Sequence, residues 1–350
     1  MSLPFALPTG RPYMIAEAGV NHDGSVEKAK ALIDIAADAK ADAVKFQLFN
    51  ADELASQDAP LAEYQQRSGE ENQYQMLKRL TLSHDDYRKL KEYAESKGLD
   101  FLTTPFDVAS AKFLAGLGVK AMKIPSGEVT NLPFLKDVAA LKMFTIISTG
   151  MSTLEEVRDA VAPFQTLNVP FALLHCVSSY PAPTKEINLR AMETLRDEFS
   201  VPVGYSDHTE GIDASVMAAA LGAQILEKHF TINRNDTGPD HAASLEPKEL
   251  KEMIRIIHDP IALRNAPMMK EALGTGEKIC QPCERNTRDV ARRSLVLAQQ
   301  MKKGEKITKA MIAIRRPGSG LPPKMLESVL GKAAQRDLAA GTVLTHDLLI

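Results

Sequence analysis

Short apolar segments alternate with amphipathic helical patterns from Tyr13 to Ile257. Each apolar segment has the length and composition of a buried strand, and the residues between two such segments repeat their apolar positions at helical spacing. Strands that alternate with helices in this way form parallel βαβ units. The predicted strands are Tyr13–Ala18, Ala43–Phe49, Phe101–Phe106, Ala121–Ile124, Phe144–Ser148, Phe171–Cys176, Val203–Tyr205 and Ile225–Phe230.

The helical segments carry recognisable start signals. Ser25 is placed to cap the first helix, and Thr153 with Glu156 and Ser83 with Asp86 have the spacing of capping boxes. About eight βα units in about 250 residues predict a closed (βα)8 TIM barrel. A doubly wound open sheet has the same alternation and is the main alternative fold.

The pattern changes after Ile257, which predicts a second, smaller domain. Residues 265–288 have mixed charge and no clear period, and are expected to be a linker between a barrel domain (1–264) and a small β-rich domain (289–350). The last part repeats itself in spacing, which indicates a compact pseudo-symmetric unit. Each copy is expected to contain a turn, a short strand and a helical turn capped by Thr. The repeated positions are Gly304, Thr308 and Ile312, then Gly341, Thr345 and Leu349.

Composition excludes several classes of protein. A net charge of -3 over 350 residues gives no nucleic-acid-binding footprint. No stretch approaches the roughly 20 apolar residues of a membrane span, and no signal peptide is expected. The three cysteines are Cys176, Cys280 and Cys283, an odd number that favours a cytoplasmic location. The C-x-x-C pair at Cys280 lacks the second pair that a zinc site needs.

Polar residues occupy nearly every predicted strand end, where a TIM barrel carries its active site. A purely structural barrel has no need of them. In strand order they are Glu17, Asn21 and His22; Lys45 and Gln47; Thr103, Thr104 and Asp107; Lys123, Ser126, Gly127 and Glu128; Ser148, Thr149 and Gly150; His175, Ser178 and Tyr180; Ser206, Asp207 and His208; and Glu227, Lys228 and His229, followed by Asp240 and His241.

Two kinds of ligand suit these residues. Lys45 and Lys123, within a ring of hydroxyls, suit a small molecule that carries a phosphate and a carboxylate. His208 and His229 end neighbouring strands and predict a divalent transition-metal site, with Glu17 or Asp240 to complete or support it. For His22, His175 and His241, a ligand role and a structural role are equally compatible with the sequence.

The strand-end segments resemble the sialic acid synthase family. The resemblance covers essentially the whole chain in order, and the C-terminal segment RRPGSGLPP (315–323) resembles that family's antifreeze-like SAF domain, a β-clip fold. The matching barrel segments are IAEAGVNHDGS (15–25), AVKFQLF (43–49), TTPFD (103–107), KIPSGEVTNLPFL (123–135), STGMST (148–153), LLHCVSSYPAP (173–183), GYSDHTEG (204–211), EKHFT (227–231) and GPDHAASLEP (238–247).

The resemblance implies a reaction and a set of site residues. The family joins C3 of phosphoenolpyruvate to the aldehyde of an N-acyl aminohexose, with C–O cleavage and phosphate release. His208 and His229 would bind the metal, Mn²⁺ in the first place, with Mg²⁺ or Co²⁺ as alternatives. Phosphoenolpyruvate would be held by Lys45, Thr104, Lys123, Ser126, Ser148, Ser178 and Ser206; the sugar by Gln47, Tyr180, Asp240 and Arg316; and the catalytic set would be Glu17, Lys45, Lys123 and Glu128.

The resemblance also implies a domain-swapped homodimer, in which Arg316 of one subunit reaches the barrel of the other. At Ser178 some family members carry Asn, which changes one phosphate contact.

Three alternatives to a synthase that uses N-acetylmannosamine stay open from the sequence. One is the same reaction on 2,4-diacetamido-2,4,6-trideoxymannose, as in an N,N'-diacetyllegionaminate synthase. The others are a Schiff-base aldolase that uses Lys123 and a non-catalytic carbohydrate-binding protein.

Overall fold

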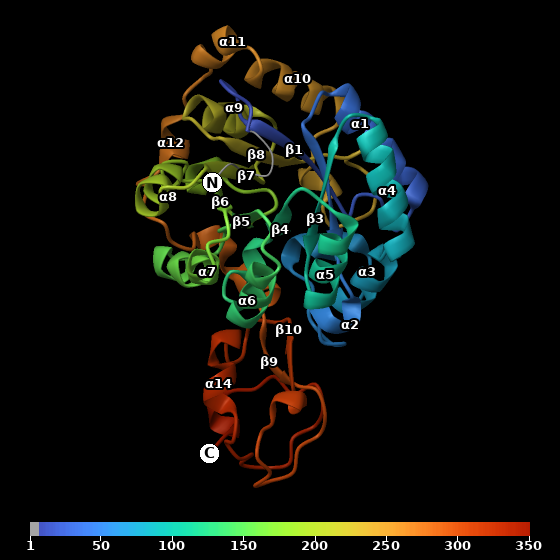
Figure 1. Cartoon of the computed structure of the whole chain (residues 1–350), viewed down its shortest axis with the longest axis vertical. Coiled ribbons are helices and arrows are strands. Elements are labelled where there is room, and N and C mark those ends of the chain that lie inside the picture. The colour runs from blue at the N-terminus through green and yellow to red at the C-terminus, as the bar shows by residue number, and fades with distance from the viewer. Residues whose placement is uncertain (1–6) are drawn as a thin grey trace.

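A computed structural model of the chain describes residues 7–350. In this part of the chain, eight parallel strands close into a barrel in sequential order and helices surround it (Figure 1). The predicted (βα)8 barrel is confirmed, and the open sheet is excluded because the first strand pairs with the eighth. The strands are β1 (Tyr13–Gly19), β2 (Ala43–Leu48), β3 (Asp100–Pro105), β4 (Met122–Ile124), β5 (Thr145–Ser148), β6 (Phe171–Cys176), β7 (Val203–Asp207) and β8 (Ile225–His229).

The helices of the barrel begin where the sequence predicts. The side chains of Ser25, Ser83 and Thr153 accept the expected backbone hydrogen bonds, and the last two complete capping boxes. The helices are α1 (Val26–Asp38), α2 (Ala51–Leu54), α3 (Gln73–Leu80), α4 (His84–Ser96), α5 (Val108–Leu117), α6 (Leu132–Ala140), α7 (Leu154–Thr166), α8 (Ala191–Phe199), α9 (Asp213–Ala220), α10 (Pro247–Ile257) and α11 (Pro260–Arg264).

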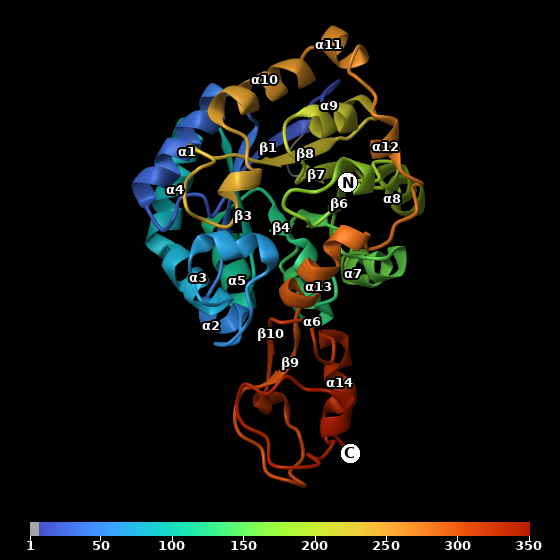
Figure 2. The ribbon, with the colours of Figure 1, turned by 180° about the vertical axis from the view of Figure 1, so that it is seen from behind.

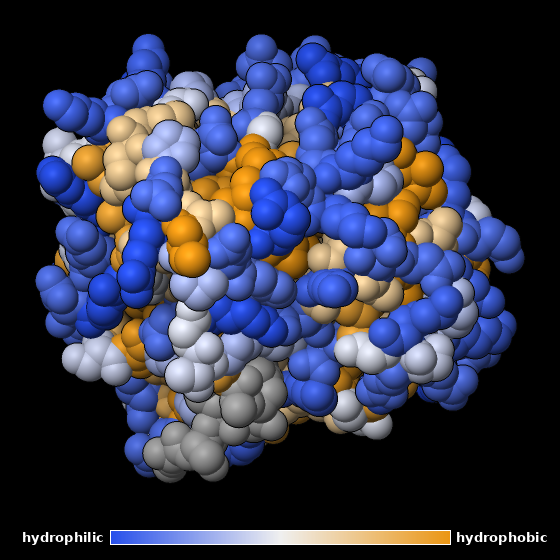
Figure 3. All heavy atoms as spheres, turned by 90° about the horizontal axis from the view of Figure 1, so that it is seen from above, coloured by the Kyte–Doolittle hydropathy of each residue, from blue (hydrophilic) through white to orange (hydrophobic). Residues whose placement is uncertain are grey.

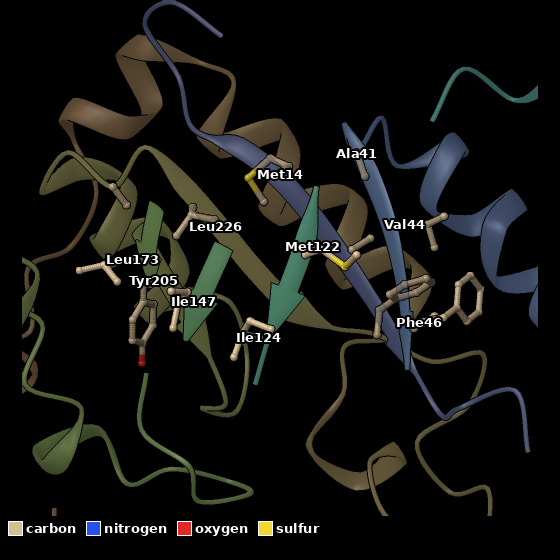
Figure 4. Packing of buried hydrophobic residues seen from close by; sticks show 14 of the residues in the cluster. Met14, Ala41, Val44, Phe46, Met122, Ile124, Ile147, Leu173, Tyr205 and Leu226 are labelled. Carbon is tan, nitrogen blue, oxygen red and sulfur yellow. The ribbon is translucent and has the colours of Figure 1, made fainter. Parts of the chain in front are cut away.

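The two faces of the barrel strands have different neighbours because successive side chains point to opposite sides. Met14, Val44 and Phe46 lie in the large cluster that packs between the strands and the outer helices (Figure 4). The alternate positions fill the barrel interior with an apolar cluster that includes Ile15 and Ala43. Two residues further along the same strands, the inward side chains become polar. Because alternate side chains point inward, the polar residues at the strand ends lie at the mouth of the barrel.

The C-terminal domain has its own core and projects from the barrel (Figure 1). It contains the antiparallel strands β9 (Ser294–Leu297) and β10 (Ile312–Arg315), the helix α14 (Leu326–Val329) and several isolated bridges. The internal repeat is visible: Gly304 and Gly341 both have a left-handed φ near 80°, and Thr308 and Thr345 both precede a 3-10 turn. The predicted caps are not made, because neither threonine side chain bonds the turn backbone.

The segment between the two domains is more structured than a linker. It contains α12 (Lys270–Leu273), a 3-10 turn at Pro282–Glu284 and α13 (Arg285–Ala291), which lies between the barrel and the C-terminal domain (Figure 2). The side chains of Lys278 and Glu284 are buried against the barrel. The domain boundaries drawn from composition remain predictions.

Hydrophilic residues surround separate apolar areas on the face seen from above, which is the side of the molecule away from the C-terminal domain (Figure 3). Within residues 7–350, no helix has the length and apolar character that crossing a membrane requires.

Candidate functional site

The carboxyl ends of the barrel strands surround one pocket, which the C-terminal domain partly covers. Arg316 of that domain reaches the pocket, and the Arg316 backbone bonds with Leu54 and Ser56 beyond β2. Among the predicted site residues, those that line the pocket are Glu17, Lys45, Gln47, Thr104, Lys123, Ser126, Ser148, Ser178, Tyr180, Ser206, His208, His229, Asp240 and Arg316.

Two lysines and two carboxylates form a buried charge network at the centre of the pocket. The strand register places Glu17 beside Lys45 on β2 and beside His229 on β8. Lys45 Nζ lies 2.7 Å from Glu17 Oε2 and 3.6 Å from Glu227 Oε2, and Lys123 Nζ lies 3.5 Å from Glu227 Oε1. All four side chains are at most 4% exposed. Positive charge is thus held where water has little access.

The two carboxylates of this network ionise differently. Burial raises the pKa of Glu17 to about 7, with Glu227 adding to the rise and Lys45 opposing it. Burial also opposes ionisation of Glu227, but Lys123 and Lys45 together bring its pKa down to about 2. Neighbouring acids with separated pKa values are the usual sign of divided roles in proton transfer. Of the two carboxyl groups, Glu227 is the one held as an anion, and Glu17 is the one whose pKa lies near neutral pH.

A cluster of hydroxyls lies beside the lysines. The buried Ser148 Oγ has no hydrogen-bond partner in the protein, and Ser126 Oγ accepts from the Gly150 amide at 2.9 Å. A Cβ added at Gly150 would collide with Ser178 Oγ and Ser126 Oγ, so the three loops converge closely there. Ser206 Oγ donates to Glu227 Oε1 at 2.9 Å. Free hydroxyls next to buried ammonium groups suit a phosphate.

The two histidines predicted as metal ligands lie next to each other in the pocket lining. Their ring centroids are 5.5 Å apart. His208 Nδ1 bonds the Val177 carbonyl at 2.8 Å, which leaves its Nε2 for a ligand. His229 Nδ1 is buried without a hydrogen-bond partner and lies 3.8 Å from Asp240 Oδ2. Burial and the charges of His208 and Lys45 lower the pKa of His229 well below its usual value. A neutral imidazole with a free nitrogen fits a divalent metal.

Part of the pocket lining is aromatic and apolar. The rings of Tyr180 and Tyr64 are tilted by 33° with centroids 4.6 Å apart, and the Tyr180 ring centroid also lies 4.1 Å from that of His208. The Arg316 guanidinium lies 5.6 Å from the Phe106 ring centroid. Arg316 Nε is buried without a partner. The rest of this wall comes from the β1 end, α2 and α3, as Val20, Leu54, Met76, Leu77 and Leu80.

Comparison with known proteins identifies the family. The NeuB family profile matches residues 32–266, and the SAF domain profile matches residues 292–350. The chain belongs to the NeuB family. The N,N'-diacetyllegionaminic acid synthases of Legionella pneumophila and Campylobacter jejuni are 45% and 43% identical to it, over 95% and 93% of this chain and 93% and 96% of theirs. The crystal structure of spore coat polysaccharide biosynthesis protein SpsE of Bacillus subtilis superposes with a TM-score of 0.83 at 34% identity, covering 99% of each chain. The predicted family and C-terminal domain type are therefore confirmed.

Glu128, which the family resemblance assigns to the catalytic set, lies outside the pocket lining. Its Oε1 accepts from Arg293 Nε at 2.6 Å and its Oε2 accepts from Asn131 at 2.7 Å. Arg293 also donates to the carbonyls of Phe106 and Ile314, so it joins the barrel to the C-terminal domain. These contacts give Glu128 a supporting position behind the pocket, and a direct catalytic role remains an untested prediction.

Glu227 and Tyr64 are polar pocket residues to which the sequence assigned no role. Glu227 precedes His229 by two positions on one strand, so period-two alternation was a sufficient signal for its inward direction. Tyr64 comes from the long segment between β2 and α3. Its approach to Tyr180 depends on how α2 and α3 fold over the barrel, which no local pattern reports.

A second group of potential metal ligands lies apart from these histidines. Within residues 7–350, Asp23, Asp236 and His241 form the one set of three whose ligand atoms lie within 4.8 Å of one another. Lys28 Nζ lies 2.8 Å from Asp23 and 3.6 Å from Asp236, and His241 Nδ1 bonds Thr231 at 2.6 Å. The lysine already balances these carboxylates, so the group is an ion-pair network.

Proposed function

We propose that this protein condenses phosphoenolpyruvate with an N-acyl aminohexose to give a nonulosonic acid and phosphate. The observation that carries the proposal is that one pocket is lined both by buried lysines and hydroxyls and by aromatic and apolar side chains. Membership of the NeuB family and the synthase names of its relatives support the same reaction.

The buried lysines and hydroxyls suit the smaller substrate. Phosphoenolpyruvate carries a phosphate and a carboxylate on three carbons, and Lys45 and Lys123 supply two buried cations for them. Ser148 Oγ, unpartnered in the protein, supplies a donor for a phosphate oxygen. The pocket is buried enough for these charge-assisted hydrogen bonds to act in a low dielectric.

Glu17 is suited to proton transfer in the second half of the reaction. After C3 of phosphoenolpyruvate has bonded to the sugar aldehyde carbon, C2 carries positive charge and a water adds there. Glu17, as the carboxylate, takes a proton from that water, and the C2–O bond to phosphate then breaks to leave a ketone. A carboxyl group with a pKa of about 7 can accept and return protons near neutral pH.

His208 and His229, with Asp240 beside them, are the residues that would hold a divalent metal, and we propose Mn²⁺. Bound there, the ion supplies Lewis-acid polarisation of the aldehyde oxygen. The unpartnered nitrogen of His229 supports this assignment.

The apolar wall favours a deoxygenated sugar. Leu54, Leu77 and Leu80 belong to a buried apolar cluster that borders the pocket, and methyl groups placed against it would be buried favourably. A 2,4-diacetamido-2,4,6-trideoxymannose presents a C6 methyl and a second acetamido methyl, whereas N-acetylmannosamine presents hydroxyls at both places. A single methyl group in an apolar site contributes roughly 1–3 kcal/mol to discrimination. We therefore propose 2,4-diacetamido-2,4,6-trideoxymannose as the better substrate.

Phosphate release from phosphoenolpyruvate with Mn²⁺, measured with each sugar in parallel and with or without chelator, tests this function. Chelator-sensitive release, at least tenfold more efficient with the diacetamido sugar, is the expected result. Efficient release with N-acetylmannosamine alone would overturn the choice of sugar, and no release with either would overturn the synthase.

One observation favours a second candidate, a Schiff-base aldolase. Burial lowers the pKa of Lys123, and a neutral amine is the nucleophile of that reaction. Borohydride treatment in the presence of pyruvate would trap Lys123 covalently in an aldolase. The synthase proposal predicts no trapped adduct by mass spectrometry, and an adduct on Lys123 would favour the aldolase.

We also propose a homodimer in which the contact of Arg316 with the barrel is exchanged between subunits. Domain swapping keeps the same contacts and moves them between identical chains, so the pocket described above would be preserved. A cytoplasmic location remains a proposal that rests on the three unpaired cysteines.

A further inference from the structure

We propose that Glu284, in the segment between the two domains, is a positioning residue for the phosphate subsite. This inference rests on the proposed function, because it assigns the serine loops to phosphoenolpyruvate. Glu284 is fully buried, and its Oε1 accepts hydrogen bonds from the amides of Met151, at 2.6 Å, and Ser178, at 2.7 Å. One carboxylate oxygen thus joins the loop after β5 to the loop after β6.

The two loops that Glu284 joins converge on hydroxyls of the phosphate subsite. Ser148 ends β5, three residues before Met151, and Gly150 N donates to Ser126 Oγ. Gly150 also packs so closely against Ser178 Oγ, in the loop after β6, that even a methyl group there would collide with it. A shift of either loop would therefore change the positions of these hydroxyls relative to one another.

The loop after β5 needs external support because of its backbone conformation. Met151 has a φ of 59°, in the left-handed region that residues with a side chain rarely adopt. The chain beyond the barrel holds this residue on both sides: Glu284 of the inter-domain segment accepts from its amide, and Arg292 Nη2 at the start of the C-terminal domain donates to its carbonyl at 2.7 Å. Lys278, 3% exposed, donates to the next carbonyl, that of Ser152, at 2.8 Å.

Glu284 is itself fixed by its own turn. Its Oε2 accepts from the Gln281 amide at 2.8 Å, and the neighbouring Cys283 amide donates to Glu186 at 2.8 Å. Glu186, at the far end of the segment between β6 and α8, therefore anchors the same turn without accepting from the amide of Met151 or Ser178. Replacing Glu186 removes only its contact with the Cys283 amide of the turn, whereas replacing Glu284 also removes the link between the two loops.

The test compares Glu284→Ala, Glu284→Gln and the control Glu186→Gln with the unchanged protein. In Glu284→Ala we expect the KM for phosphoenolpyruvate to rise about tenfold or more while the KM for the sugar changes less than twofold. Glu284→Gln keeps one oxygen that can accept from both amides, so it should stay within about threefold of the unchanged protein. Glu186→Gln should leave both KM values within twofold.

Hydrogen–deuterium exchange gives a readout that needs no turnover. The amides of Met151 and Ser178 should exchange at least tenfold faster in Glu284→Ala, and unchanged in Glu186→Gln. If Glu284→Ala does not fold, Glu284→Gln takes its place in the test. Its amide exchange and its KM for phosphoenolpyruvate should then change in the same direction, by smaller amounts. Unchanged amide exchange and an unchanged KM for phosphoenolpyruvate in the Glu284 variants would overturn this role. Absence of turnover in the unchanged protein, with faster exchange in the variants, would instead overturn the proposed function alone.

Discussion

Glu17 Oε2 lies 2.7 Å from Lys45 Nζ, and both side chains are buried at the barrel mouth. Lys45 keeps its charge there because Glu17 and Glu227 raise its pKa against the effect of burial. The pair therefore brings a proton acceptor and a fixed cation to the place where the polar strand ends converge. A reaction that binds an anion and then deprotonates water needs both groups within one small site.

Replacing Glu17 by Gln should separate binding from turnover. The amide keeps the size of the side chain but cannot accept a proton, so kcat should fall by about 10²–10⁴-fold. Phosphoenolpyruvate should still raise the melting temperature, since Lys45 and Lys123 remain. Measurement of phosphate release and thermal shift on the same sample checks both effects. Substantial turnover in Glu17→Gln would remove this residue from the proton-transfer step.

Replacing Ser148 by Ala should weaken phosphoenolpyruvate binding without destabilising the protein. Its hydroxyl is buried with no protein partner, so the folded state loses no hydrogen bond when it is removed. The KM for phosphoenolpyruvate should rise about tenfold, which corresponds to about 1.4 kcal/mol. Thr103→Val is the matched control, since Thr103 Oγ1 is also buried and unpartnered but lies outside the pocket lining. Equal effects of the two substitutions on KM would refute the phosphate contact.

His175 should make the stability of the protein fall in mild acid. Burial lowers the pKa of this histidine to about 3, with the charge of Lys278 adding to the effect, whereas an unfolded chain has a histidine pKa of about 6.5. Below pH 6.5 the unfolded chain therefore binds a proton that the folded protein does not. The free energy of unfolding should drop by about 1.4 kcal/mol per pH unit between about 6.5 and 3 from this group.

Urea unfolding between pH 7 and 4.5 measures this slope. His175→Gln should reduce it by about one proton's contribution, whereas His346→Gln, at an exposed position of the C-terminal domain, serves as the control. An identical slope in the His175 variant and the unchanged protein would contradict the assignment.

The proposed exchange of Arg316 between subunits can be tested by complementation. Glu17→Gln and Arg316→Ala chains, each with a different tag, are each expected to be poorly active alone. If Arg316 is supplied by the partner, mixed dimers contain one site with neither change, and co-expression should restore roughly a quarter of the unchanged activity. Equal expression of the two chains is verified by mass spectrometry. No recovery would show that each barrel uses the Arg316 of its own chain, as in the contact described above.

The sequence was sufficient for the parts of this protein that follow a local period. The strands and the inward direction of Lys45 and Lys123 follow from period-two alternation, and the helix starts follow from capping residues such as Ser25. Other features depend on tertiary contacts that no local pattern shows. Nothing near Glu284 in the sequence reveals that it folds back onto Met151, and only the fold shows that Arg293, far away in sequence, bonds the Glu128 carboxylate.

The measurement that tests the central claim most directly follows the oxygen between C2 and phosphorus of phosphoenolpyruvate. With ¹⁸O at that bridging position, the protein, Mn²⁺ and 2,4-diacetamido-2,4,6-trideoxymannose, mass spectrometry locates the label among the products. Attack by C3 followed by C–O cleavage predicts the ¹⁸O in the released phosphate and an oxygen from water at C2 of the sugar acid. Label retained in the organic product would mean that the P–O bond breaks instead, and would contradict the reaction proposed for this pocket.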